Sequence, residues 1–84
     1  MTNKLREIIK ILLFLKQISV KELSKNVSFS YEALRNFLTY RTKMRMDNIK
    51  EIFDYLNFDF SKAILLATQD IDRKKIIEGI INEI

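Results

Sequence analysis

Hydrophobic residues recur along this chain at three- and four-residue spacing, which is typical of α-helices that bury one face. The first predicted helix covers residues 3–16, and its main apolar stripe consists of Leu5, Ile8, Ile9, Leu12 and Leu15. Phe14 lies nearly opposite Leu5 on such a helix, and Ile11 and Leu13 also fall outside the stripe. The helix therefore has apolar surface on more than one side, which indicates burial all round or a second interface.

Capping residues and the same spacing predict further helices along the rest of the chain. Ser19 and Glu22 have the spacing of a capping box, and Ser30 is a second N-cap. The last helix is expected to begin after a cap at Asp70. These helices are predicted over residues 20–26, 31–39, 46–56, 61–67 and 71–84. Because the chain has no proline and one glycine, we expect an all-α fold, a compact bundle of five to six helices.

The composition limits the chemistry that the chain can perform. It has no cysteine and no histidine, so it lacks the commonest metal ligands and the commonest general base. No pair of carboxylates stands out either, and we therefore expect no metal, no cofactor and no enzymatic activity. The apolar run at residues 8–15 is too short to span a bilayer, which favours a cytoplasmic protein with no membrane association.

The positive charge is concentrated in the middle of the sequence. The net charge is +4, but residues 16–45 carry seven basic and two acidic side chains, a local net charge of +5. Residues 46–84 carry five basic and eight acidic side chains, a local net charge of −3. This distribution is expected if the middle third meets a polyanion, although a merely solvated lysine-rich surface would also produce it.

Two short predicted helices lie inside this basic third, joined by a turn of three residues, Val27-Ser28-Phe29. Ser24 is the small residue that a close crossing of two helices requires, and Ser28 is the candidate for a left-handed or bridge conformation in the turn. The residues expected to face inward on both sides are Val20, Leu23, Phe29, Leu34 and Phe37.

The stretch 18–39 resembles the helix-turn-helix domains of the lambda-repressor/Cro family, also described as the xenobiotic response element family. Residues 41–56 look like the basic loop and fourth helix of that family, so the resemblance covers about residues 4–67. The family often has glutamine at the position of Val20, alanine at Ser24, glycine at Ser28, and glycine at Tyr40 or Arg41. The resemblance implies a helix-turn-helix in helices 2 and 3 and a DNA-binding domain over 1–67. The last 17 residues fall outside it, and the C-terminal helix over 68–84 is expected to pack on the domain, to dimerise, or both.

The resemblance also implies which residues would meet double-stranded DNA. The exposed start of the second motif helix would contact base edges through Tyr31, Glu32 and Arg35. The residues expected at phosphates are Ser19, Lys21, Asn36, Thr39, Arg41, Lys43 and Arg45. The competing interpretation is a solvated ion pair between Glu32 and Arg35 and ordinary solvated lysines.

The last helix has an apolar stripe that exceeds what a small core needs. It consists of Ile76, Ile77, Ile80, Ile81 and Ile84. We expect a homodimer held by Ile77, Ile80, Ile81, Ile84 and Phe14, with Ile77 and Ile81 at its centre. The alternative is that the helix folds back wholly onto its own core.

Together these patterns predict a sequence-specific DNA-binding transcriptional regulator, a phage- or plasmid-type repressor that occludes a promoter. The alternative is a protein-interaction module on the same fold, such as an antitoxin or a phage-encoded inhibitor with a protein partner. Five net positive charges around one motif favour DNA over a protein partner.

Overall fold

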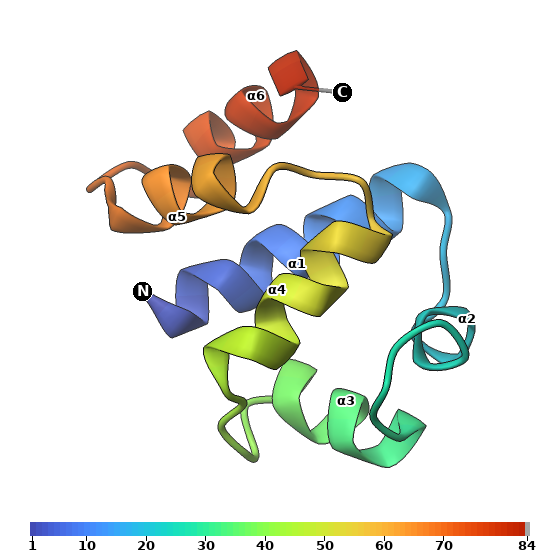
Figure 1. Cartoon of the computed structure of the whole chain (residues 1–84). Coiled ribbons are helices and arrows are strands. Elements are labelled where there is room, and N and C mark those ends of the chain that lie inside the picture. The colour runs from blue at the N-terminus through green and yellow to red at the C-terminus, as the bar shows by residue number, and fades with distance from the viewer. Residues whose placement is uncertain (84) are drawn as a thin grey trace.

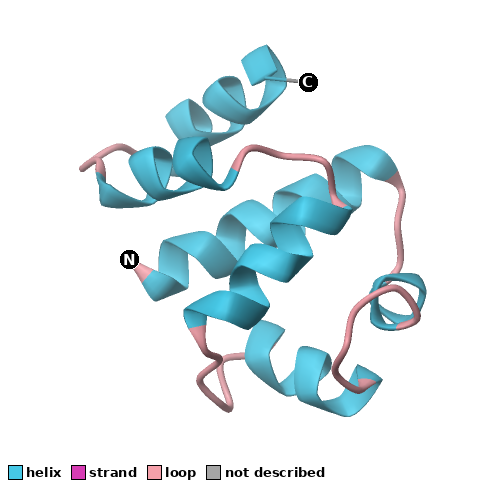
Figure 2. Cartoon of the chain, viewed as in Figure 1, coloured by secondary structure: helices cyan, strands magenta, loops and turns pink. Residues whose placement is uncertain are grey.

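The computed structural model describes residues 1–83, which form helices joined by loops and contain no strand (Figure 1, Figure 2). Six helices are present in this range: α1 (Thr2–Lys16), α2 (Val20–Ser24), α3 (Tyr31–Leu38), α4 (Met46–Tyr55), α5 (Phe60–Thr68) and α6 (Arg73–Glu83). The predicted all-α fold of five to six helices is therefore confirmed. None of the helices described has the length and apolar character needed to cross a bilayer.

Helix α1 runs through the middle of the molecule, with α2 and α3 on one side and α5 and α6 on the other (Figure 1). It contacts α3, α5 and α6. Four members of its predicted stripe have no exposed surface, namely Leu5, Ile8, Ile9 and Leu12. Leu15 is exposed at the end of the helix, whereas Ile11 and Leu13 outside the stripe are buried. The middle of α1 is thus buried on more than one side, whereas its last turn is not.

The rest of the core is made by the inward faces of the shorter helices. Side chains with no exposed surface include Leu23, Leu34, Phe37, Ile49, Ile52 and Phe53. The Phe53 ring lies 6.1 Å from the ring of Phe58 and 5.7 Å from that of Phe60, centroid to centroid. Phe29 and Tyr55 are half-buried and pack against this cluster. Phe29 and Phe37, the two aromatic residues predicted to face inward, therefore both pack in or against the core.

The helix starts agree with the predicted caps except at α6. The Ser19 hydroxyl accepts a hydrogen bond from the Glu22 backbone N–H at 3.0 Å, and that of Ser30 accepts from Ala33 N–H at 3.1 Å. Helix α6 begins at Arg73 rather than residue 71. Asp72 caps it by accepting from the Lys75 N–H at 2.9 Å, so the prediction of Asp70 as the cap was wrong by two residues.

The apolar stripe of α6 divides between the core and the surface. Ile76 and Ile80 are buried against the domain, Ile77 is half-buried, and Ile81 is 54% exposed. Ile80 has no exposed surface, so its predicted place at a dimer interface was wrong; the residue belongs to the core of the single chain. Ile84, also predicted at that interface, lies outside the described residues.

Candidate nucleic-acid interface

The turn between α2 and α3 is held by a carboxylate from α4. The Ser28 backbone N–H donates to Glu51 Oε2 at 2.6 Å, and the Ser28 hydroxyl donates to Glu51 Oε1 at 2.7 Å. Ser28 does not have a positive φ, so of the two conformations predicted for it, left-handed or bridge, the left-handed one is not adopted. Because Glu51 accepts both donors of Ser28, the turn is fixed without the glycine that the resemblance leads one to expect.

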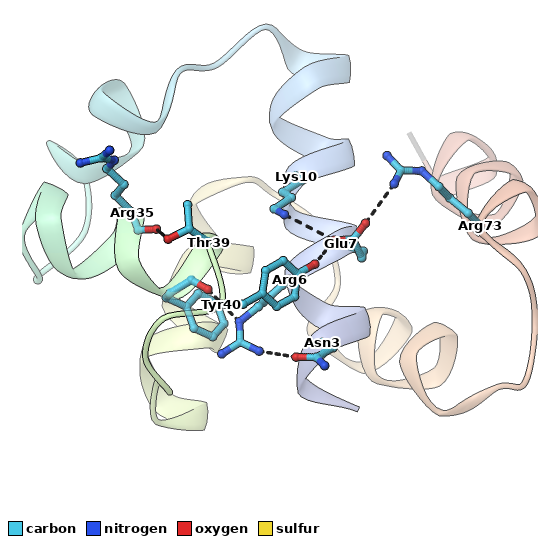
Figure 3. A network of polar contacts seen from close by, with 9 residues as sticks. Asn3, Arg6, Glu7, Lys10, Arg35, Thr39, Tyr40 and Arg73 are labelled. Atoms are coloured by element: carbon cyan, nitrogen blue, oxygen red, sulfur yellow. Dashed lines mark hydrogen bonds and ion pairs between the residues drawn. The ribbon is translucent and has the colours of Figure 1, made fainter.

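The first five residues of α3 present three polar side chains to solvent. Tyr31, Glu32 and Arg35 are all exposed, whereas Leu34 and Phe37 on the other face have no exposed surface. Among the described residues no ion pair joins Glu32 to Arg35. Figure 3 shows the Arg35 side chain pointing away from the neighbouring polar network. A hydroxyl, a carboxylate and a guanidinium are thus displayed together without being engaged with one another.

The segment 40–45 between α3 and α4, here called the basic loop, exposes Arg41, Lys43 and Arg45. It begins at Tyr40, whose φ of 65° is left-handed and costs about 1 kcal/mol in a residue other than glycine. The Tyr40 side chain offsets this strain, because its hydroxyl donates to Glu7 and its ring lies 4.4 Å from Lys10 Nζ. A tyrosine is therefore tolerated at a position where the resemblance leads one to expect glycine.

Arg6 of α1 anchors the basic loop, and the sequence interpretation missed it. Its side chain is 6% exposed. Nε donates to the Phe37 carbonyl at 2.7 Å, one Nη donates to the Thr42 carbonyl at 2.7 Å, and the other donates to Asn3 Oδ1 (Figure 3). The guanidinium also lies 4.5 Å from the centre of the Phe37 ring. The only signal in the sequence is that Arg6 shares a helix face with apolar residues at i+3 and i+7.

A second polar cluster ties α6 to α1 and to the basic loop. Glu7 accepts from the Tyr40 hydroxyl, forms an ion pair with Lys10 at 3.5 Å, and forms another with Arg73 at 3.0 Å (Figure 3). The hydrogen bond from Tyr40 and the positive charges of Lys10 and Arg73 hold the pKa of Glu7 below its usual value, against the opposing effect of burial. The charges of Glu7, Lys10 and Arg73 are thus paired within this cluster.

The basic residues of the middle third are less often paired than those elsewhere, of which four of eight form an ion pair with a described carboxylate. Six of its seven cations form no ion pair with any described carboxylate: Lys16, Lys21, Lys25, Arg35, Arg41 and Lys43. The seventh, Arg45, pairs with Asp47 at 3.2 Å on an exposed surface, where such a pair contributes little. The α2–α3 pair and the basic loop therefore carry positive charge that nearby carboxylates do not neutralise.

The other residues predicted at phosphates fall into two groups. Lys21 and Ser19 are exposed at the start of α2, although the Ser19 hydroxyl is engaged in capping. Thr39 and Asn36 lie at the end of α3; the Thr39 hydroxyl donates to the Arg35 carbonyl at 2.8 Å, and Asn36 is half-buried. The backbone carbonyl of Asn36 accepts from the Arg41 backbone N–H at 2.9 Å, which fixes the start of the basic loop.

An apolar surface lies on the side of α1 that faces α6. Phe14 is 81% exposed, and Ile81 and Leu15 are exposed as well. Phe14 and Leu15 line a hollow of about 340 Å³ whose other apolar walls are Ile11 and Ile77. Phe14, Leu15, Ile77 and Ile81 are here called the Phe14 surface. Of the five residues predicted to dimerise, Phe14, Ile77 and Ile81 thus remain at least partly accessible.

Comparison with protein-family models, with curated proteins and with solved structures finds no match to this chain. Within residues 1–83, no group of three or more histidine, cysteine, aspartate or glutamate side chains is placed to hold a metal ion.

Proposed function

We propose that this protein is a helix-turn-helix regulator that binds duplex DNA sequence-specifically and represses transcription by occluding a promoter. The observation that supports this most strongly is the unneutralised charge around α3. Six of the seven cations in residues 16–45 have no carboxylate partner among the described residues, so their positive charge is available to a polyanion.

The dimensions of α3 suit the major groove. An α-helix with its side chains is about 10–12 Å across, and the major groove is about 12 Å wide, so a helix such as α3 fits between its walls. With the start of α3 in the groove, Arg35 can pair bidentately with guanine, and Glu32 can accept from cytosine. The basic loop at the far end of α3 then approaches the phosphates that border the groove.

Pairing of two copies belongs to this proposal, because one short helix reads only a few base pairs. A two-fold dimer would place two α3 helices about one turn of DNA apart, roughly 34 Å. The Phe14 surface is the apolar area available for that contact, since Phe14 and Ile81 are exposed and Ile80 is not.

The experiment that tests the proposal is selection from a pool of randomised duplexes at low salt, followed by titration of the enriched sequence and of a scrambled one. We expect one enriched motif, bound at least a hundredfold more tightly than the scrambled duplex. Retention of no duplex at 50 mM salt would contradict the proposal.

The second candidate is a protein-interaction module, and the observation that favours it is the Phe14 surface. A side chain as exposed as Phe14, beside an apolar hollow, is typical of protein contacts. This candidate becomes the better one if the selection experiment enriches no sequence.

A further inference from the structure

We propose that a phosphate group of the DNA backbone binds in a hollow between the start of α1 and the basic loop, and that the buried Arg6 positions this site. The inference rests on the proposed function and adds a contact from α1 that the sequence did not indicate. The hollow has a volume of about 530 Å³. Its walls are made by Thr2, Asn3, Arg6, Tyr40, Arg41, Thr42, Lys43 and Met44.

The charge of Arg6 supports an anion site in this hollow. A buried charge is costly unless an opposite charge or several hydrogen bonds compensate it. Arg6 is 6% exposed, and its hydrogen-bond acceptors are two backbone carbonyls and the side-chain amide of Asn3. No described carboxylate pairs with it. The guanidinium therefore keeps a full positive charge at the wall of an open hollow, where an anion would be stabilised.

Arg6 shares the walls of the hollow with two other cations. Arg41 and Lys43 line the same hollow, are exposed, and have no carboxylate partner in the described chain. Three cations around one concave surface focus positive potential there, and the hydroxyls and amide of the other polar walls offer further hydrogen-bonding groups. This chemistry fits a phosphodiester, which carries one negative charge and several acceptor oxygens.

The position of the hollow relative to α3 also suits a backbone phosphate. The basic loop follows the end of α3, about 8–14 Å along the helix axis from Arg35, Glu32 and Tyr31, the residues predicted to meet bases. The major groove is about 12 Å wide, so a phosphate at the border of the groove can lie in the hollow while the start of α3 lies between the strands. Arg6 acts through the loop, because its bonds to the Phe37 and Thr42 carbonyls fix where Arg41 and Lys43 stand.

The test is an isosteric change of charge inside the hollow. Asn3→Asp keeps an oxygen acceptor for Arg6 Nη, so the fold is retained, but it adds a negative charge where the phosphate would bind. Asn82→Asp is the matched control, because Asn82 is exposed on α6, on the other side of α1 (Figure 1). We expect Asn3→Asp to lower the affinity for a duplex about fivefold to tenfold at 0.1 M salt and to reduce the slope of log K against log salt by about 0.9. Asn82→Asp should leave the slope unchanged. Equal losses in the two variants, with equal slopes, would overturn the proposal.

A second measurement separates this site from the DNA-binding proposal. In titration of the ¹⁵N-labelled protein with inorganic phosphate, the amide signals of Asn3, Arg41, Thr42 and Lys43 should shift and saturate in the millimolar range. These shifts should be lost in Asn3→Asp and kept in Asn82→Asp. If they are seen and no duplex binds, the anion site stands and the proposed function fails. If duplexes bind but the phosphate shifts are linear or alike in both variants, the function stands and the site is refuted.

Discussion

Replacing Glu51 by alanine should weaken the turn between α2 and α3 and destabilise the protein. Glu51 accepts two hydrogen bonds from Ser28, at 2.6 and 2.7 Å. A hydrogen bond to a charged group contributes about 1.5–3 kcal/mol, but Ser28 is exposed and water can replace part of the interaction. We therefore expect a total loss of about 1.5 kcal/mol in the free energy of unfolding. For a domain of this size the loss corresponds to a fall in Tm of roughly 6–12 °C.

Urea unfolding followed by circular dichroism measures this change as a lower midpoint with an unaltered m-value. Ser28→Ala removes the hydroxyl bond alone and should lose about half as much. The control is Asp54→Ala on the same helix: its exposed ion pair with Lys50, at 3.1 Å, contributes at most about 0.5 kcal/mol. The reasoning is refuted if Glu51→Ala and Asp54→Ala have the same midpoint, or if the losses of Glu51→Ala and Ser28→Ala simply add in the double variant.

Three further outcomes are expected. Arg35→Ala should weaken binding to a selected duplex by about 1–3 kcal/mol and leave binding to scrambled duplexes nearly unchanged, because a bidentate contact reads one base; an equal loss on both would make Arg35 a phosphate contact only. Phe14→Glu and Ile81→Glu should each keep the fold, since both side chains are exposed, and should shift a dimer seen by light scattering to monomer; a wild-type protein that is monomeric at micromolar concentration contradicts this. The pKa of Glu7 is depressed in the folded state, so its contribution to stability is present at neutral pH and is lost as the pH falls below about 4.5. Glu7→Gln should therefore flatten this part of the pH profile of Tm. An unchanged profile contradicts the role of the hydrogen bond from Tyr40.

The fold could be predicted largely from local sequence. Helical spacing and the caps at Ser19 and Ser30 are properties of neighbouring residues, and the structure reproduces both. The last helix was harder to place, because Asp70 and Asp72 are equivalent as caps in sequence and only packing of Ile76 and Ile80 against the domain decides between them. Packing likewise decides that Ile80 is core while Ile81 is surface.

The candidate site was predictable only in its exposed half. Arg35 and the basic loop are visible as charges beside a helix, whereas the groups that hold them come from distant parts of the chain. Glu51 reaches Ser28 across 23 residues, and Arg6 reaches the Thr42 carbonyl across 36. Neither pairing has a local sequence pattern. Before the helices are assembled, Glu51 cannot be told from an ordinary surface glutamate, nor Arg6 from an ordinary surface arginine.

The salt dependence of binding tests the central claim most directly. Duplex affinity is measured between 50 and 200 mM salt for the wild type, for Arg41→Gln/Lys43→Gln/Arg45→Gln, and for the control Lys62→Gln/Lys74→Gln/Lys75→Gln, which removes the same charge from α5 and α6. If the α2–α3 pair and the basic loop bind DNA, the loop variant lowers the slope of log K against log salt by about 2–3 units, and the control leaves it near that of the wild type. The account is contradicted if the two variants change the slope equally, or if the wild type binds no duplex at 50 mM salt.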